Sequence, residues 1–125
     1  MIIEKLTNTL SDNEYTIIND FILENFDNSR LDTYEKIIIY SINNYIIGFL
    51  GISNNYLNQL CVKKEYRCQG IAKILLEYAR KILIDKIYLF VDKNKSDTQY
   101  LLHFYLKNGF IIDYENREEY KMFKY

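Results

Sequence analysis

The sequence predicts an α/β fold with a mixed, mostly antiparallel sheet, and two features of the chain carry this prediction. Two runs rich in β-branched and aromatic residues, 36–42 and 45–52, flank Asn43-Asn44, which tolerates the positive φ of a two-residue hairpin turn. The segment 56–91 then follows the order strand, helix, strand. That order requires a crossover, and therefore two parallel strands within an otherwise antiparallel sheet.

Length and composition indicate a single domain spanning residues 1–125, because 49% hydrophobic residues can form a core without disulfides or a metal. The net charge of -1, with both signs scattered, argues against nucleic acid or membrane as a partner and favours a small molecule or peptide. Cys61 and Cys68 match neither a redox pair nor a zinc knuckle, so we expect reduced thiols. The chain shows no signal peptide, and its apolar run 46–52 is too short to span a bilayer, which predicts a cytoplasmic protein.

The N-terminal part predicts a strand at residues 1–7 followed by a helix. Ser11 and Glu14 have the spacing of a capping box at the start of this helix. Helical spacing then relates Tyr15, Ile18, Ile22 and Phe26, and we expect the helix to end within 25–28.

The second half predicts alternating strands and helices. A strand at 56–62 leads through a loop into a helix, one face of which carries Ile71, Ile74, Leu75, Tyr78 and Ile82. The opposite face of that helix carries Lys73, Glu77 and Lys81. A buried strand at 87–91 precedes a helix at 96–108, which Gly109 ends and which includes Leu101, Leu102, Phe104 and Tyr105.

The segment 57–76 predicts an anion site, because a strand ends, a loop follows and an amphipathic helix begins at once. The first turn of a helix has unpaired N–H groups and the positive end of the helix dipole. Gly70 lets a ligand approach the backbone, and Ala72 adds no bulk. Phosphate oxygens suit such a site. Taken alone, R-x-x-G-x-A also fits a tight turn beside a solvated Arg67.

Two landmarks make the chain resemble the GNAT superfamily of N-acetyltransferases. Arg67, Gly70 and Ala72 match the family motif Q/R-x-x-G-x-G/A, and LCVKKEYR matches the approach to it. The later HFYLKNGF, with Gly109, is similar to the second landmark of the family, an aromatic-Tyr pair followed by a basic residue and Gly-Phe. The resemblance covers most of the chain and implies the GNAT fold, a mixed sheet with helices on both faces.

The resemblance implies acetyl-CoA as cosubstrate, bound by residues 60–73. The pantetheine arm would pair with the strand backbone, and N–H groups of the loop would hold the pyrophosphate. Thr98 stands where many members carry a pantetheine-binding Asn. The implied cofactor contacts are Leu60, Cys61, Val62, Arg67, Cys68, Gln69, Gly70, Ile71, Ala72, Lys73 and Thr98.

The resemblance also implies direct attack of an amine on the thioester, with Tyr105 as the acid that protonates the departing thiolate. A phenol pKa of ~10 against a thiol pKa of ~8.5 makes this feasible. Among 13 tyrosines, Tyr105 could equally be a core residue. His103 is interpreted as a surface residue, because i and i+2 side chains of a helix face different ways.

The predicted function is transfer of an acetyl group to a primary amine of a small molecule, peptide or protein. Asn58 and Gln59 replace the carboxylates that many relatives carry on the cofactor strand, so the sequence identifies no general base. That departure keeps open a catalytically silent module that binds CoA thioesters. An unrelated nucleotide binder is disfavoured, because neither G-x-G-x-x-G nor G-K-[ST] occurs. The acceptor, the acyl length and the choice between monomer and homodimer stay open.

Overall fold

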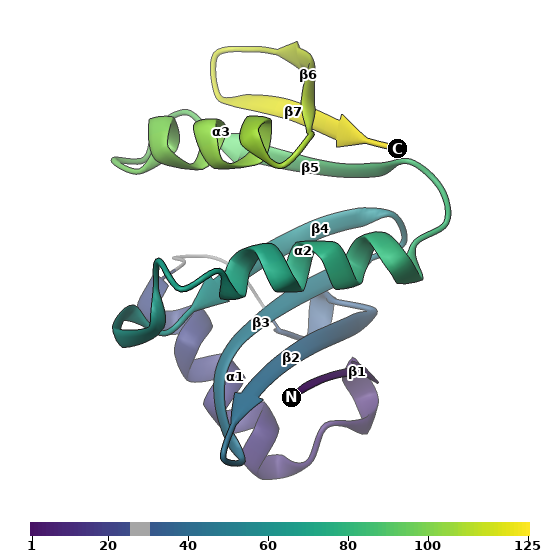
Figure 1. Ribbon diagram of the computed structural model, residues 1–125, viewed down its shortest axis with the longest axis vertical. Helices are drawn as coiled ribbons and strands as arrows, with labels where there is room; N and C mark the ends of the chain where they lie inside the picture. The colour runs from purple at the N-terminus through teal and green to yellow at the C-terminus, as the bar shows by residue number, and fades with distance from the viewer. Residues whose placement is uncertain (26–30) are drawn as a thin grey trace.

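The computed structural model describes residues 1–25 and 31–125, which form a seven-stranded sheet and three α-helices (Figure 1). The strands are β1 (Ile2–Leu6), β2 (Lys36–Ile42), β3 (Tyr45–Ser53), β4 (Tyr56–Val62), β5 (Ile87–Asp92), β6 (Ile111–Glu115) and β7 (Glu119–Lys124). The helices are α1 (Asp12–Asn25), α2 (Ile71–Ile82) and α3 (Thr98–Lys107). Short 3₁₀ turns occupy Thr7–Thr9, Leu31–Thr33 and Lys64–Tyr66.

The sheet confirms the mixed topology expected from the sequence. Its strand order is β1-β2-β3-β4-β5-β7-β6. The β4–β5 pair is parallel, and the other neighbouring pairs are antiparallel. The β2–β3 hairpin is also confirmed, since Asn43 and Asn44 have φ values of 50° and 69°.

Helices cover both faces of the sheet, as the GNAT resemblance implies. Alternation along β2 shows this directly: Ile37 and Ile39 join the core cluster of α1, whereas Ile38 joins the cluster that includes α2. Side chains of α3 pack against the same cluster as α2. Figure 1 shows α2 and α3 side by side, with their N-terminal ends at the same end of the molecule.

The capping box at the start of α1 forms as predicted. The Ser11 N–H donates to Glu14 Oε1 at 2.8 Å, and the Glu14 N–H donates to Ser11 Oγ at 3.1 Å. Ile18 and Ile22 are fully buried. Tyr15, which has the same helical spacing, is 42% exposed. Phe26 lies outside the described residues.

The buried stripe of α2 differs from the predicted one. Ile74 is 39% exposed, whereas Leu76 and Ala79 are buried together with Ile71 and Leu75. Successive residues of a helix are about 100° apart around its axis. A modest rotation of the helix therefore buries residues at one edge of the apolar face and exposes residues at the other edge. The contacts of α2 with the sheet and with the α3 side decide which flank is buried.

The hairpin of β6 and β7 was not predicted by the sequence analysis. All residues of β6 are exposed, so the strand lacks the alternation that marks a half-buried strand. β7 inserts between β5 and β6 and places Met122 in the core. Among the described residues, no helix has the length and apolar character needed to cross a membrane.

Candidate functional site

The strands β4 and β5 separate after a short parallel ladder. The ladder ends at the pair Leu57↔Leu89. The other edge of β4 stays paired with β3 as far as Val62, which lies opposite Gly48. Residues 60–62 therefore present an edge that faces away from β3 and lies beyond the ladder with β5.

The separation coincides with an irregularity in β4. Gly51 pairs with Gln59, and the next residue of β3, Ile52, pairs with Leu57, so that Asn58 is an extra residue in β4. One extra residue on one strand is a β-bulge, and a bulge bends the strand that carries it. The bulge therefore accounts for the turn of β4 away from β5.

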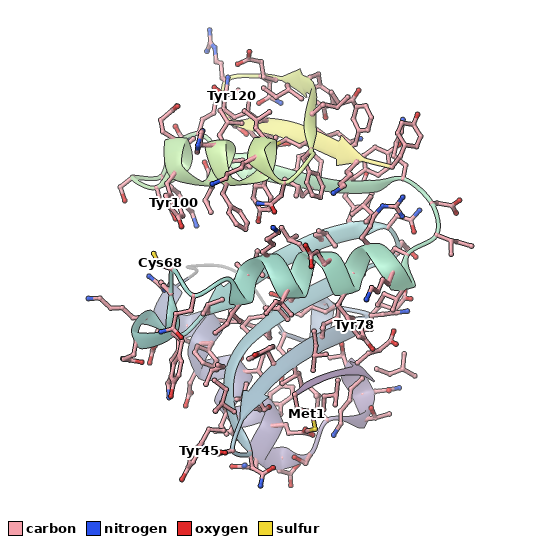
Figure 2. The ribbon with its side chains drawn as sticks, in the orientation of Figure 1. Met1, Tyr45, Cys68, Tyr78, Tyr100 and Tyr120 are labelled. Atoms are coloured by element: carbon pink, nitrogen blue, oxygen red, sulfur yellow. The ribbon has the colours of Figure 1, made fainter. Side chains whose placement is uncertain are left out.

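A pocket of about 350 Å³ lies between the end of β4, the loop that follows it and the N-terminal parts of α2 and α3. Figure 2 shows Cys68 of the loop and Tyr100 of α3 at the same end of the molecule, on either side of the space between the two helices. The pocket is lined by Leu60, Cys61, Val62, Tyr66, Arg67, Cys68, Gly70, Ile71, Ala72, Lys73, Asp97, Tyr100, Leu101 and Phe104. We call it the β4–α2 pocket.

Nine of the eleven residues that the resemblance implied for cofactor binding line this one pocket. They come from the end of β4, the connecting loop and the first turn of α2, and they are Leu60, Cys61, Val62, Arg67, Cys68, Gly70, Ile71, Ala72 and Lys73. The fold thus gathers an extended strand edge and a helix N-terminus beside the same space.

Gly70 leaves the start of α2 open toward a ligand. It is the N-cap residue of α2 and adopts a left-handed conformation with φ 82°, and no side chain caps the helix. A Cβ on Gly70 would meet nothing within 4 Å, so the space beside it is open. The N–H groups of the first turn lack partners within the helix, and the positive helix dipole adds to their attraction for an anion. The geometry therefore suits phosphate oxygens.

Arg67 has a structural contact in addition to its place beside the pocket. Its Nε donates a hydrogen bond of 2.9 Å to the carbonyl of Val62. The bond ties the loop to the end of β4. The N–H of Lys63 donates to the carbonyl of Ile47 in β3, and backbone groups alternate along a strand, so those of Val62 and Leu60 point away from β3. Because the Val62 carbonyl already accepts a bond from Arg67, Leu60 is better placed to pair with an extended ligand.

Two residues implied for cofactor binding do not line the pocket. Thr98 is buried, and its hydroxyl lies 2.5 Å from the carbonyl of Asp92 and 2.8 Å from that of Lys95. It therefore fastens the start of α3 to the end of β5. Gln69 is exposed, and its Nε2 lies 3.4 Å from the carbonyl of Glu65.

Tyr105 packs beside the pocket and is absent from its lining. Its ring meets Phe104 edge-on at 5.3 Å and Phe110 at 5.7 Å between centroids. Burial, and secondarily the nearby carboxylate of Asp97, raise the pKa of Tyr105 above its ordinary value. The phenol therefore stays protonated across the neutral range, as a proton donor requires.

Five lining residues were not identified as site residues by the sequence analysis. Four of them, Asp97, Tyr100, Leu101 and Phe104, recur at i, i+3, i+4 and i+7 along α3. The sequence shows that these four residues share one face of the predicted helix. It does not show which part of the fold that face packs against. Tyr66, the fifth, ends the 3₁₀ turn before the loop.

Cys61 is a poor nucleophile in this environment. The side chain is buried, and burial raises the pKa of its thiol to about 11, although Arg67 acts in the opposite direction. A thiol that stays protonated at neutral pH does not attack a thioester readily. Cys68 is the exposed loop residue that the sequence predicts, with φ 64°.

A family model described as an acetyltransferase (GNAT) domain matches residues 33–112, a span that runs from the end of the 3₁₀ turn before β2 to the start of β6. The chain therefore belongs to the GNAT acetyltransferase family. The match includes the β4 bulge, the Gly70 turn and α3, and so covers every residue that lines the β4–α2 pocket.

Solved structures share the fold over nearly the whole chain. PaiA N-acetyltransferase from Thermoplasma acidophilum, solved with coenzyme A, is 19% identical with a TM-score of 0.70, covering 99% of this chain and 98% of that one. ElaA from Escherichia coli is 14% identical with a TM-score of 0.75, covering 100% and 99%. A chain of the NatC complex bound to Gag peptide and CoA is 22% identical with a TM-score of 0.71, covering 98% and 97%.

Proposed function

We propose that this protein is an N-acetyltransferase that uses acetyl-CoA and transfers the acetyl group to a primary amine. One observation carries the proposal: β4 leaves β5 beside the open Gly70 turn, so that a free strand edge and an uncapped helix N-terminus border one pocket. An extended pantetheine arm suits the free strand edge, and a pyrophosphate suits the uncapped helix N-terminus. The CoA named with PaiA and with the NatC complex supports the same assignment.

The residues present fit such a ligand. Backbone groups of the β4 edge that point away from β3, those of Leu60 above all, would bind the pantetheine amides, and the N–H groups of residues 70–73 would bind the phosphates. Gly70 fits because the position of its missing Cβ is open space that a larger side chain would fill. Acetyl-CoA brings an activated thioester, which an amine can attack without a covalent enzyme intermediate.

Direct transfer is favoured because the buried cysteine at the end of β4 is a poor nucleophile. The thiol of Cys61 is held protonated by burial. Tyr105 would act as the acid that protonates the departing thiolate, since its raised pKa keeps the proton on the phenol. The Gag peptide named with the NatC complex makes a peptide amine one reasonable acceptor class, beside small amines.

A catalytically silent CoA-binding module is the second candidate, and the amide side chains of β4 favour it. Asn58 Nδ2 donates to Ser53 Oγ at 2.8 Å, so Asn58 occupies the bulge as a structural residue and supplies no base. Under this alternative the pocket binds acetyl-CoA, yet no amine is acetylated.

A screen of amine acceptors for release of the CoA thiol separates the two candidates. The panel contains polyamines, amino acids and short peptides with free N-termini, each mixed with acetyl-CoA and the full chain. Thiol release that depends on both the amine and the protein supports the enzyme. Saturable acetyl-CoA binding without thiol release from any amine supports the silent module, and absence of binding contradicts both.

A further inference from the structure

A second groove lies between α2 and the C-terminal end of α3, and it meets the β4–α2 pocket at Lys73, which lines both. Its volume is about 570 Å³, and residues from the beginning of β5 and the end of β7 complete its lining. The groove is lined by Lys73, Leu76, Glu77, Arg80, Lys81, Ile87, Lys107, Asn108, Gly109, Phe110 and Lys124. We call it the interhelix groove.

Positive charge is concentrated around this groove in a chain whose net charge is -1. Five of its side chains are cationic, and Glu77 alone is anionic. Within the parts of the chain that the structure describes, the ion pairs are Lys5–Glu14, Lys36–Glu4 and Lys93–Glu115. None of the cations of the groove takes part in one. Like charges that gather without counter-ions repel each other and attract an anion.

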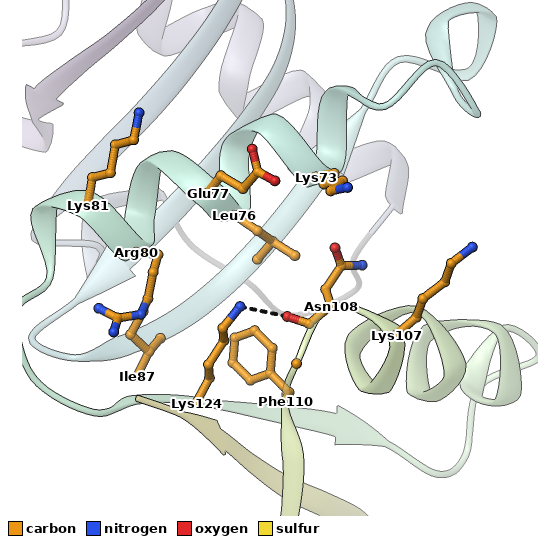
Figure 3. A pocket seen from close by; sticks show the side chains of 11 residues that line it. Lys73, Leu76, Glu77, Arg80, Lys81, Ile87, Lys107, Asn108, Phe110 and Lys124 are labelled. Atoms are coloured by element: carbon orange, nitrogen blue, oxygen red, sulfur yellow. Dashed lines mark hydrogen bonds between the residues drawn. The ribbon is translucent and has the colours of Figure 1, made fainter.

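The cations come from both walls of the groove. In Figure 3, Lys73 and Arg80 belong to α2, and Lys107 lies across from them at the end of α3. Lys81 lies at the rim and points away from Lys124, so it contributes less to the interior. An anion between the helices would therefore meet positive groups on two sides.

Lys124 is held in place inside the groove. Its Nζ donates a hydrogen bond of 2.8 Å to the carbonyl of Asn108 (Figure 3). Gly109 adopts φ 94°, and a Cβ on Gly109 would lie 3.0 Å from that Nζ and 3.1 Å from the adjacent Cε. The glycine thus permits the close approach, and the ammonium is pre-ordered, with N–H groups left for a ligand.

The floor and the size of the groove define the ligand further. Leu76, Ile87 and Phe110 are buried side chains that form an apolar base beneath the cations. The volume of the groove lies within the range of small-molecule sites and is too small for a polymer. We propose that the interhelix groove is a second anion site, which binds a small molecule carrying two or more phosphoryl groups. Arg and Lys together suit phosphate, because Arg donates in a fork and Lys acts as a point charge.

Calorimetric titration of the full chain with inorganic tripolyphosphate at low salt tests this proposal. We expect one saturable site that weakens as salt is added. Arg80→Gln and Lys107→Gln should each weaken binding about tenfold or more, because each removes a charge-assisted contact. Lys63→Gln and Lys64→Gln, at exposed lysines outside the groove, should leave it unchanged. Unchanged melting temperatures establish that the variants are folded.

The same titration in the presence of saturating CoA identifies the source of any phosphate binding. Tripolyphosphate that still binds beside CoA, and binds equally well to Gly70→Asp, occupies the interhelix groove, although the shared Lys73 can weaken binding beside CoA. Binding that CoA or Gly70→Asp abolishes belongs to the Gly70 turn and overturns the proposal. Absence of saturable binding, indifference to Arg80→Gln and Lys107→Gln, or tighter binding of an oligoglutamate peptide than of tripolyphosphate would also overturn it.

Discussion

Leu57 of β4 and Leu89 of β5 form the last pair of the parallel ladder that joins the two parts of the sheet. Directly after Leu57, Asn58 bulges from the β3–β4 pairing, and the two strands separate. The separation leaves an edge of residues 60–62 beside the turn at Gly70. Two local irregularities, a bulge and a left-handed glycine, therefore create the pocket on which the proposed function rests.

Acetyl-CoA should stabilise the folded protein. A ligand that binds only the native state adds RT ln(1 + [L]/Kd), or about 2.7 kcal/mol at a hundredfold excess over Kd. For a domain of this size we expect a rise in melting temperature of several degrees, measured by differential scanning fluorimetry. Desulfo-CoA should give a similar rise, because it keeps the pantetheine and the phosphates. An unchanged melting temperature of the folded protein in millimolar acetyl-CoA would contradict the assignment of the β4–α2 pocket as the CoA site.

Gly70→Asp should abolish CoA binding while most of the fold persists. The change places bulk and negative charge where phosphates are expected, and a residue other than Gly at φ 82° is strained by about 1–2 kcal/mol. Isothermal titration with CoA measures the loss. Gly70→Asn is the matched control, because Asn has the shape of Asp and a similar tolerance of left-handed backbone without the charge, and it should retain weaker binding. Parent-like affinity in Gly70→Asp would place the phosphates elsewhere.

Tyr105→Phe should lower turnover without harming binding. The ring contacts with Phe104 and Phe110 remain, so the melting temperature and the CoA affinity should change little. Loss of a general acid should reduce kcat by about 10²–10⁴, with a smaller effect on KM. Steady-state kinetics with an acceptor found in the screen measure this. Tyr78→Phe, a half-buried tyrosine of α2, controls for removal of a hydroxyl. If Tyr105→Phe keeps full activity, Tyr105 is a packing residue.

Activity should rise from neutral towards alkaline pH in the parent and in Tyr105→Phe alike. A primary amine with a pKa of ~10.4 is mostly protonated near pH 7, and β4 carries no carboxylate to remove its proton. The pKa of Tyr105 is raised, so the acid form persists throughout this range and is lost only above the ordinary tyrosine value. A pH profile of kcat/KM tests this, and a decline between neutrality and pH ~9 would contradict it.

Local signals in the sequence determined much of the fold and of the candidate site. The Asn43-Asn44 turn, the Ser11–Glu14 capping box and the strand-loop-helix junction at Gly70 all depend on residues close together in the chain. Their conformations follow from backbone sterics and from hydrogen bonds within a few residues. For that reason the junction at Gly70 indicated an anion site from the sequence alone, whereas the individual contact residues came from the GNAT resemblance, and nine of those eleven line one pocket.

The tertiary structure decided what depends on distant neighbours. The exposed strand β6 has no pattern of its own and forms because β7 pairs with it and with β5. The hydroxyl of Thr98 turns to the backbone at the end of β5, and Ile74 rather than Leu76 is left in solvent, because the packing of each helix fixes its rotation. The interhelix groove joins Arg80 of α2 to Lys107 of α3 and Lys124 of β7, three cations that meet only when the sheet and its helices assemble.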